Sequence, residues 1–554
     1  MKNKLFKILT ALFVVCVMAF TLSACSNDGN KGNNDGDDKP DEIVYVTEGV
    51  VYEISDDQTY AIVKDYTGDA KYVEILSTYE NLPVRVIGEE AFYYAFEMVK
   101  IKIPDSVTEI GAKAFGSCEK LIEVKIPSDV EIIDFDTFSG CIMLSSVTIP
   151  DTVTEIKARA FNTCRSLTEL IIPKSVATMG YDVFSSCYAL TLRCKAESMP
   201  EGWSGDFEVY YGFEPVPVVW DCDNNTIATD NNEYAVINGV RYALKGENAT
   251  VALQPYTIIN ANIPQMVNYS GKTYSVNKMV KNAFYCCGLL QSATVPSSIT
   301  DIPERAFYYC TALSSLTIES GVQVIWDNAI QECSSLAEVV IPESVIAILS
   351  NAFNSNPALT IYCEVAEKPD GWYNDWVYEN DCKKVWNCKT NEVAEDGNIY
   401  KIIDGVRYAL KDGVATVVRQ PANLVDIVIP ASVEYKGQTY AVTTIESYAF
   451  YQIESLKKVN ILDGVETIQQ YAFYSCSFMT ELVIPTSVTT IGRCAITSDH
   501  YNLWVYCQSG SKLAGWDNSW SLISAVCYYS ETEPTTSGLF WRYVDGVITR
   551  WGAE

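Results

Sequence analysis

A 23-residue spacing of bulky apolar residues constrains the fold of this chain more than any other feature. The spacing occurs in three runs of five, four and three repeats. The positions are Phe92, Phe115, Phe138, Phe161 and Phe184, then Phe284, Phe307, Ile330 and Phe353, then Phe450, Phe473 and Ile496. A unit this short holds one strand and one turn, so it cannot bury its apolar face alone. The units must stack, and the sequence predicts a solenoid.

One unit, residues 110–132, reads IGAKAFGSCEKLIEVKIPSDVEI. Val124 and Ile126 alternate with the polar Glu123 and Lys125, which predicts a short strand with one face inward. We expect the strands of successive units to form a parallel sheet about 4.8 Å apart. The phenylalanine is expected on a short helical turn, with its ring in the interior.

The sequence also repeats over a longer period, which includes a whole run of the 23-residue repeats. Residues from Tyr234 to Phe284 reappear 166 positions later, from Tyr400 to Phe450. We therefore expect three modules, at 43–222, 234–388 and 399–527, followed by a linker and hairpin-like tail at 528–554. Asn238-Gly239 and Asp404-Gly405 are hairpin signals that open the second and third modules, and each hairpin should cap an open edge. The first module opens with a diverged version of this segment.

A Gly-Trp motif ends each module. The pattern is Cys-x7-Gly-Trp-x3-(Trp or Phe), with Cys194, Gly202, Trp203 and Phe207, then Cys363, Gly371, Trp372 and Trp376, then Cys507, Gly515, Trp516 and Trp520. Its place at every module end favours a capping role. Stacking of the tryptophans on sugars is the alternative.

The pieces A-F-x-x-C-x-x-L and I-P-x-S-V-T resemble the consensus of the BspA-like, Treponema pallidum type of bacterial surface leucine-rich repeat protein, over most of residues 87–507. The resemblance implies a leucine-rich repeat solenoid, mainly β with short helical turns, here in three stacked modules with β-hairpin caps. It also implies surface display, binding of host or microbial proteins, and no catalysis.

The N-terminus predicts export. Lys2, Lys4 and Lys7 precede an apolar stretch, and Leu22-Ser23-Ala24-Cys25 resembles a bacterial lipobox. We expect residues 1–24 to be a lipoprotein signal peptide, Cys25 to be lipidated, and residues 25–42 to form an acidic tether. An ordinary secretory peptide with a chance cysteine is the alternative. The expected location is extracytoplasmic, anchored by lipid to the bacterial membrane or outer surface.

Composition excludes several functions. Seventy acidic and forty basic residues give a formal charge of −30, which disfavours binding to nucleic acid. His500 is the only histidine, so a multi-histidine metal site is impossible and histidine-based hydrolysis has one possible base. We expect no cofactor, no metal and no enzymatic activity, and a surface or interface position for His500.

The 19 cysteines follow the repeats. Two ladders have the 23-residue spacing: Cys118, Cys141, Cys164 and Cys187, and Cys287, Cys310 and Cys333. They are expected to be buried thiols, although neighbouring rungs could oxidise. Disulfides are possible at module ends between Cys194 and Cys222 and between Cys363 and Cys388. Cys507 with Cys527 is a weaker parallel.

Tyrosine is abundant, with 36 residues, and several follow the core phenylalanine directly. Possible partner contacts are Tyr93, Tyr94, Tyr308, Tyr309, Tyr451 and Tyr474, with Tyr285 in a similar place. Tyrosine gives adaptable contact area at interfaces; packing over neighbouring turns is the alternative. The expected function is a non-catalytic surface lipoprotein that binds a macromolecular partner as an adhesin or interaction scaffold. The alternative is a glycan- or cell-wall-binding module that uses tryptophan and tyrosine.

Overall fold

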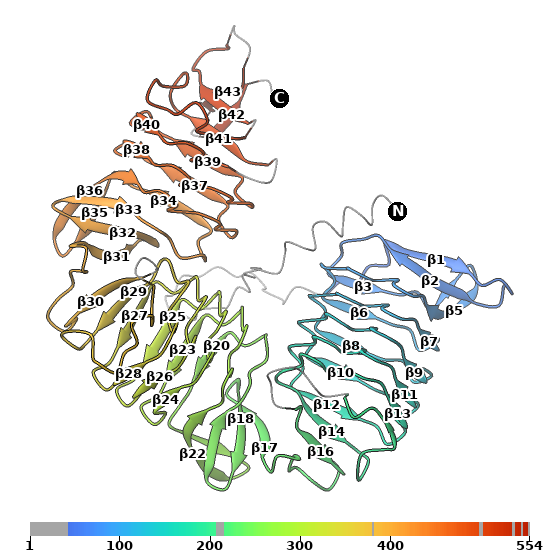
Figure 1. Ribbon diagram of the computed structural model, residues 1–554. Helices are drawn as coiled ribbons and strands as arrows, with labels where there is room; N and C mark the ends of the chain where they lie inside the picture. The colour runs from blue at the N-terminus through green and yellow to red at the C-terminus, as the bar shows by residue number, and fades with distance from the viewer. Residues whose placement is uncertain are drawn as a thin grey trace, which may run out of the picture. The chain divides into compact units, whose positions relative to one another are not determined.

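The computed structural model describes residues 43–206, 215–378, 382–497, 502–523, 525–534, 538–544 and 547–551 (Figure 1). The predicted signal peptide, Cys25, the tether, Phe207 and His500 lie outside these residues. The described chain forms two compact bodies. The first comprises residues 43–258 and 266–287, and the second comprises residues 259–265 and 288–551.

The repeats place two series of parallel strands along the first body. The longer strands are β3 (Tyr72–Glu74), β6 (Lys100–Lys102), β8 (Glu123–Lys125), β10 (Ser146–Thr148), β12 (Glu169–Ile172), β14 (Thr191–Cys194) and β16 (Val218–Trp220). The second series is β5 (Leu82–Ile87), β7 (Glu109–Ile110), β9 (Ile132–Ile133), β11 (Glu155–Ile156), β13 (Thr178–Met179) and β15 (Gly202–Trp203). Val124 lies opposite Val147 of the next repeat. The predicted parallel stacking is therefore confirmed.

The second body repeats this arrangement. Its longer strands are β20 (Asn260–Asn262), β23 (Ser292–Val295), β25 (Ser315–Ile318), β27 (Glu338–Ile341), β29 (Thr360–Cys363), β30 (Lys383–Trp386), β34 (Asp426–Ile429), β37 (Lys458–Ile461), β39 (Glu481–Ile484), β41 (Trp504–Cys507) and β42 (Val526–Tyr529). The short strands are β24 (Asp301–Ile302), β26 (Val324–Ile325), β28 (Ala347–Ile348), β38 (Thr467–Ile468) and β40 (Thr490–Ile491).

Antiparallel strands open each run of repeats. They are β1 (Val50–Ile54), β2 (Ala61–Tyr66) and β4 (Thr78–Tyr79); β17 (Glu233–Ile237), β18 (Val240–Lys245), β19 (Asn248–Val251), β21 (Met266–Tyr269) and β22 (Lys272–Met279); and β31 (Ile399–Ile403), β32 (Val406–Lys411), β33 (Val414–Val417), β35 (Ser432–Tyr435) and β36 (Gln438–Ile445). The hairpins predicted at Asn238-Gly239 and Asp404-Gly405 are confirmed. Asn238 and Gly239 have φ of 51° and 82°, as a type I′ turn requires. At the C-terminal end, β43 (Phe540–Val544) pairs with β44 (Val547–Arg550).

The segment around each repeated phenylalanine is a turn, and the expected short helical turns are wrong. The described residues contain strands and turns but no helix, and hence none able to cross a membrane. Lys113 and Ser117, two residues before and after Phe115, have φ of 55° and 56°. A right-handed helix needs negative φ at every residue, so these two positions exclude it.

Lateral hydrogen bonds explain why the backbone accepts this conformation. The N–H groups of Lys113, Phe115 and Ser117 donate to carbonyls of the next repeat at residues 135, 137 and 139, over 2.9, 2.9 and 2.7 Å. The intervening Gly116 N–H donates to Lys113 O within its own turn. Each of these N–H groups thus has a hydrogen-bond acceptor although the segment is not a helix. We call this third side of the solenoid, formed by the turns around the repeated phenylalanines, the turn edge.

The interior is a column of rings. Phe92, Phe115, Phe138, Phe161 and Phe184 are almost fully buried, with centroids 5.3 to 5.8 Å apart and planes within 12° of parallel. The ladder cysteines are buried thiols that form no disulfide. Deletion of one ring would therefore leave a cavity between two neighbours.

Candidate functional site on the turn edge

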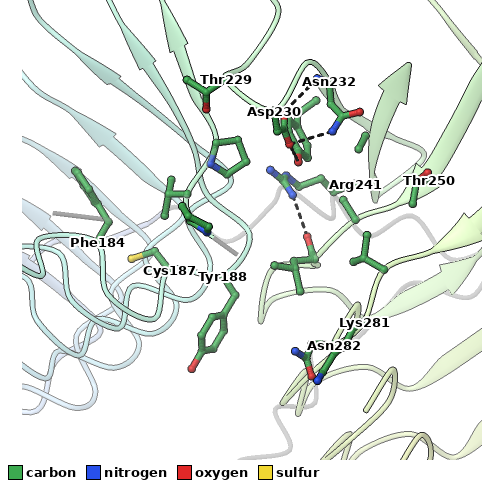
Figure 2. A pocket seen from close by; sticks show the side chains of 18 of the residues that line it. Phe184, Cys187, Tyr188, Thr229, Asp230, Asn232, Arg241, Thr250, Lys281 and Asn282 are labelled. Carbon is green, nitrogen blue, oxygen red and sulfur yellow. Dashed lines mark hydrogen bonds between the residues drawn. The ribbon is translucent and has the colours of Figure 1, made fainter. Parts of the chain in front are cut away.

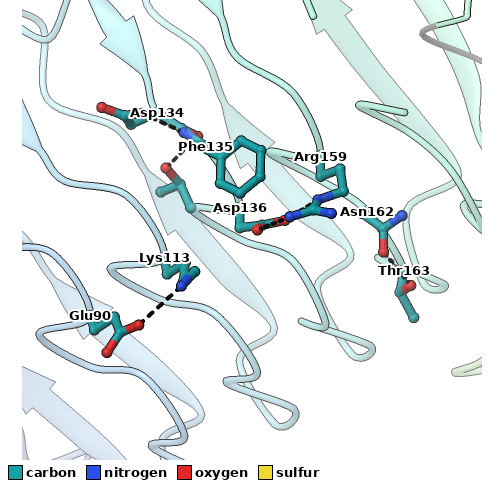
Figure 3. A network of polar contacts seen from close by, with 9 residues as sticks. Glu90, Lys113, Asp134, Phe135, Asp136, Arg159, Asn162 and Thr163 are labelled. Carbon is teal, nitrogen blue, oxygen red and sulfur yellow. Dashed lines mark hydrogen bonds and ion pairs between the residues drawn. The ribbon is translucent and has the colours of Figure 1, made fainter. Parts of the chain in front are cut away.

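Equivalent positions of successive repeats are neighbours on the turn edge, and this decides its chemistry. In the first body, the position two residues before the phenylalanine carries alternating charges (Figure 3). Lys113 Nζ lies 3.1 Å from Glu90 Oε1, and Arg159 donates to both carboxylate oxygens of Asp136 over 3.0 and 2.8 Å. Each partner is 23 residues away in sequence. This part of the edge therefore satisfies its own charges.

In the last run of repeats, in the second body, the equivalent part of this edge is aromatic. Tyr448 and Tyr471 lie two residues before Phe450 and Phe473, and Tyr451 and Tyr474 lie one residue after them. We call these four residues the tyrosine cluster. Tyr448 stacks on Tyr471 with centroids 5.1 Å apart, and Tyr451 stacks on Tyr474 at 5.7 Å. The two columns meet edge to face, at 5.5 Å in both repeats.

This stacking decides which parts of the rings are available. Tyr448 is 43% exposed, and the other three rings are half-buried. Because the rings of each column face one another, much of their flat surface is already covered. A sugar ring needs such a face, whereas a protein partner can use ring edges and hydroxyl groups. The geometry suits polar and aromatic contacts with a protein better than sugar stacking.

Arg419 supports the tyrosine cluster from one end. Its guanidinium carbon lies 5.3 Å from the centre of the Tyr451 ring, and Nη1 donates to Tyr448 O over 2.9 Å. Burial lowers the pKa of Arg419 to about 10, still well above neutral pH. The side chain is therefore a fixed cation that holds two of the four tyrosine positions in place.

The six tyrosines predicted as partner contacts lie in three separate places along the chain. Tyr451 and Tyr474 belong to the tyrosine cluster. Tyr93 and Tyr94 form a half-buried pair with hydroxyls 3.2 Å apart. Tyr308 and Tyr309 form another half-buried pair, with centroids at 6.2 Å.

At least one of these six tyrosines packs against the neighbouring repeat. A Cβ atom added to Gly116 would come within 2.7 Å of the Tyr93 ring, so Tyr93 lies over the next turn. Sequence reasoning missed Tyr448 and Tyr471 because it considered only positions after the phenylalanine. The signal that could have found them is their own 23-residue spacing.

The Gly-Trp motifs close the ends of the repeat runs. Trp203, Trp372 and Trp516 are buried, and their indole N–H groups donate to carbonyls of Val176, Val345 and Val488 over 3.1, 3.1 and 3.0 Å. The buried indoles leave no face for a sugar, which favours the capping interpretation.

The capping segment also satisfies the last turn. Trp376 O accepts the Phe353 N–H and Trp520 O accepts the Ile496 N–H, both over 3.1 Å. Gly371 is required because a Cβ there would lie 2.2 Å from Ile346 O.

The predicted disulfide pairs are neighbours in the backbone. Cys222 N–H donates to Cys194 O over 3.0 Å, and Cys388 N–H donates to Cys363 O over 2.9 Å. Neither pair is joined by a disulfide in this structure. The two disulfides stay predictions.

The chain matches the family model described as the BspA type leucine rich repeat region, in six copies that span residues 75–193, 265–360 and 422–506. These residues make up more than half of the sequence. The chain belongs to the BspA-type leucine-rich repeat family. A search of the curated proteins gives no significant match.

Several of the solved structures similar to this BspA-type protein are bacterial leucine-rich repeat proteins. One from Bacteroides ovatus is 19% identical, with coverage of 90% of this chain and 100% of that chain and a TM-score of 0.26. The T. pallidum leucine rich repeat protein is 20% identical, with coverage of 53% and 91% and a TM-score of 0.20. A leucine rich cell surface protein from Faecalibacterium prausnitzii is 19% identical, with coverage of 85% and 96% and a TM-score of 0.19. Because these TM-scores are low, the assignment rests on the repeat model.

Proposed function

We propose that this BspA-type protein is a non-catalytic cell-surface protein that binds a protein partner through its turn edge, as an adhesin or interaction scaffold. The tyrosine cluster carries this proposal. It gathers four aromatic side chains on one part of the edge. At equivalent positions, the first body carries charged side chains that form ion pairs with one another.

The order of the tyrosine cluster favours binding. Immobilising a flexible side chain at an interface costs about 0.5–1.5 kcal/mol. Stacking and the contact with Arg419 already restrict these rings in the free protein. Tyr448, which is 43% exposed, can therefore contact a partner at a reduced entropic cost.

A catalytic role has little support. The strongly shifted pKa values belong to groups such as Cys287, Tyr242 and Arg241, and burial is the largest cause in each. Cys287 and Tyr242 pack in the interior. Structural burial therefore accounts for these shifts without an acid and base acting on a substrate.

Export and anchoring complete the proposal. Cleavage before Cys25 and lipidation of its thiol would tie the protein to the membrane, and residues 26–42 would separate the repeats from the lipid. The three modules at 43–222, 234–388 and 399–527 would then face outward. The disulfides Cys194–Cys222 and Cys363–Cys388 would stabilise the ends of the first two.

The test compares two double variants of the unlipidated full chain. Purified host extracellular proteins and a glycan array are screened, and any protein that binds is titrated against each variant. Tyr451→Ser with Tyr474→Ser should weaken binding at least about fivefold, since truncation of a hot-spot tyrosine at an interface costs more than about 1 kcal/mol. Tyr373→Ser with Tyr378→Ser, at two exposed tyrosines outside the turn edge, is the control. Binding only to glycans, or equal binding by the cluster variant, would refute the proposal.

A further inference from the structure

The same polar arrangement occurs twice, where an opening hairpin packs on the last strands of the preceding repeats. In the first body, Arg241 is buried in β18, and its Nη2 donates to Thr191 Oγ1 over 2.6 Å. Its guanidinium lies 4.1 Å from the centre of the Tyr234 ring. In the second body, Arg407 donates to Thr360 Oγ1 over 2.9 Å and lies 4.7 Å from Tyr400. We call these arrangements the first and second joint.

In each joint the tyrosine hydroxyl also donates a hydrogen bond to an aspartate. Tyr234 donates to Asp230 Oδ2 over 2.7 Å, and Tyr400 donates to Asp396 Oδ2 over 2.6 Å. In the second joint, Lys383 Nζ also lies 3.1 Å from Asp396 Oδ2 and 5.6 Å from the Tyr400 ring centre. The ammonium thus sits between a carboxylate and an aromatic ring.

The first joint has no lysine at this place. Trp220 in β16 lies opposite Cys194, and Trp386 in β30 lies opposite Cys363. Three residues before these tryptophans stand Pro217 and Lys383, so Pro217 takes the place of the lysine. Among the described residues, no lysine or arginine forms an ion pair with Asp230.

A cavity of about 650 Å³ lies at the first joint (Figure 2). Asp230, Tyr234, Arg241 and Pro217 line it. Asn282, at the position that Tyr448 occupies in the second body, also lines the cavity. It is only 4% exposed, and its Oδ1 has no hydrogen-bond donor. A buried acceptor without a donor costs about 1–3 kcal/mol, which points to a ligand that supplies one.

We propose that this cavity binds an alkylammonium group, which takes the place of Lys383 between Asp230 and the Tyr234 ring. Arg241 and Lys281 also line the cavity. In the second joint Arg407 and Lys383 coexist, and Glu446 is a further acid that interacts electrostatically with both; Val280 stands at the place of Glu446 in the first joint. Val216 and Pro217 provide apolar surface for the alkyl stem. The group comes either from a free primary amine or from a lysine side chain of a peptide.

The probe is Nα-acetyl-lysine amide, titrated calorimetrically into the unlipidated full chain, with Nα-acetyl-norleucine amide as the control that lacks the ammonium. The lysine probe should bind at one site per chain. Asp230→Asn, which preserves the shape of the side chain, should weaken it at least about tenfold, because a charge-assisted hydrogen bond is lost. Asp396→Asn should leave binding unchanged.

Two further variants separate a ligand site from a structural cavity. Pro217→Lys should fill the first joint with the chain's own ammonium and abolish probe binding. Lys383→Ala should open the second joint and raise the stoichiometry from one site to two. Butylamine and a lysine-containing pentapeptide then distinguish the two sources of the ammonium. Equal binding of the norleucine control, or no binding by a protein with unchanged melting, would overturn the proposal.

Discussion

The Cys141 thiol donates a hydrogen bond to Phe115 O in the preceding repeat, over 3.2 Å. Cys164 does the same to Phe138 O. Where the ladder position is Asn356, its Nδ2 donates to Ile330 O over 2.7 Å and to Phe353 O over 2.8 Å. The position therefore favours a small side chain that carries a donor, which explains the periodic cysteines without disulfides. Ala95 and Ile453 occupy it in the first repeat of the first and third runs.

Buried ladder thiols should resist alkylation. Burial raises the pKa of Cys141 to about 12, so its reactive thiolate is almost absent at pH 8. We expect iodoacetamide to leave Cys141 unmodified in the native protein and to modify it in urea, as measured by peptide mass spectrometry. The partly exposed Cys494, which belongs to neither proposed disulfide, is the control. Native modification of Cys141 at the rate of Cys494 would contradict its assigned burial.

Loss of one core ring should have a local effect. Phe138→Ala should cost about 3–5 kcal/mol, because the ring is fully buried between Phe115 and Phe161. In a solenoid this loss acts mainly on neighbouring repeats. Limited proteolysis should open residues near 115–161 first and leave residues 399–527 resistant. Simultaneous cleavage of both regions would contradict the expected modularity.

A Gly-Trp glycine should tolerate no side chain. Gly371→Ala places a Cβ atom about 2.2 Å from Ile346 O, so the capping segment must shift. We expect a stability loss of about 1–3 kcal/mol, measured by thermal melting. Gly205→Ala is the matched control, since nothing lies within 4 Å of its added Cβ. Equal melting of the two variants would show that the cap does not depend on this approach.

The second joint should weaken in acid. Burial alone would raise the pKa of Asp396, but hydrogen bonds from Tyr400 and Lys383 outweigh it and lower that pKa. The folded state thus favours the carboxylate, and its stabilisation is present above the unfolded pKa of about 3.9 and is lost as pH falls through the folded value. Lys383→Met should reduce the difference in melting temperature between pH 7 and pH 3. An unchanged difference would exclude Lys383 from this effect.

The proposed lipid anchor depends on one residue. Cys25→Ala should abolish partition into the detergent phase and leave uncleaved or released protein. Ser26→Ala is the neighbouring control. A Cys25→Ala protein that still partitions with detergent and carries the same processed N-terminus would refute lipidation at Cys25.

The strands could be predicted because inward residues such as Val124 and outward ones such as Lys125 repeat at each turn. The conformation of the turns could not. The left-handed positions are occupied by Lys113, Asp136 and Arg159 rather than by glycine, so they carry no local sequence signal. Hydrogen bonds to the next repeat stabilise them, and such bonds exist only after stacking.

The candidate site was predictable only in part, for a similar reason. The positions of Tyr451 and Tyr474 after the core phenylalanine indicated partly exposed rings. Their stacking into a cluster with Tyr448 depends on contacts between repeats. The joints could not be predicted, because Arg241 and Thr191 are far apart in sequence and meet only when the hairpin packs on β14.

The direction of the hydrogen bonds along the turn edge has a consequence for how such genes can change. Every turn offers N–H groups toward the C-terminal side and carbonyls toward the N-terminal side. An in-frame duplication or deletion of 23 codons therefore joins complementary surfaces at any internal boundary, while the hairpin and the Gly-Trp cap stay in place. We expect natural variants to differ by whole multiples of this length, and partial insertions to be confined to the connections outside the repeats.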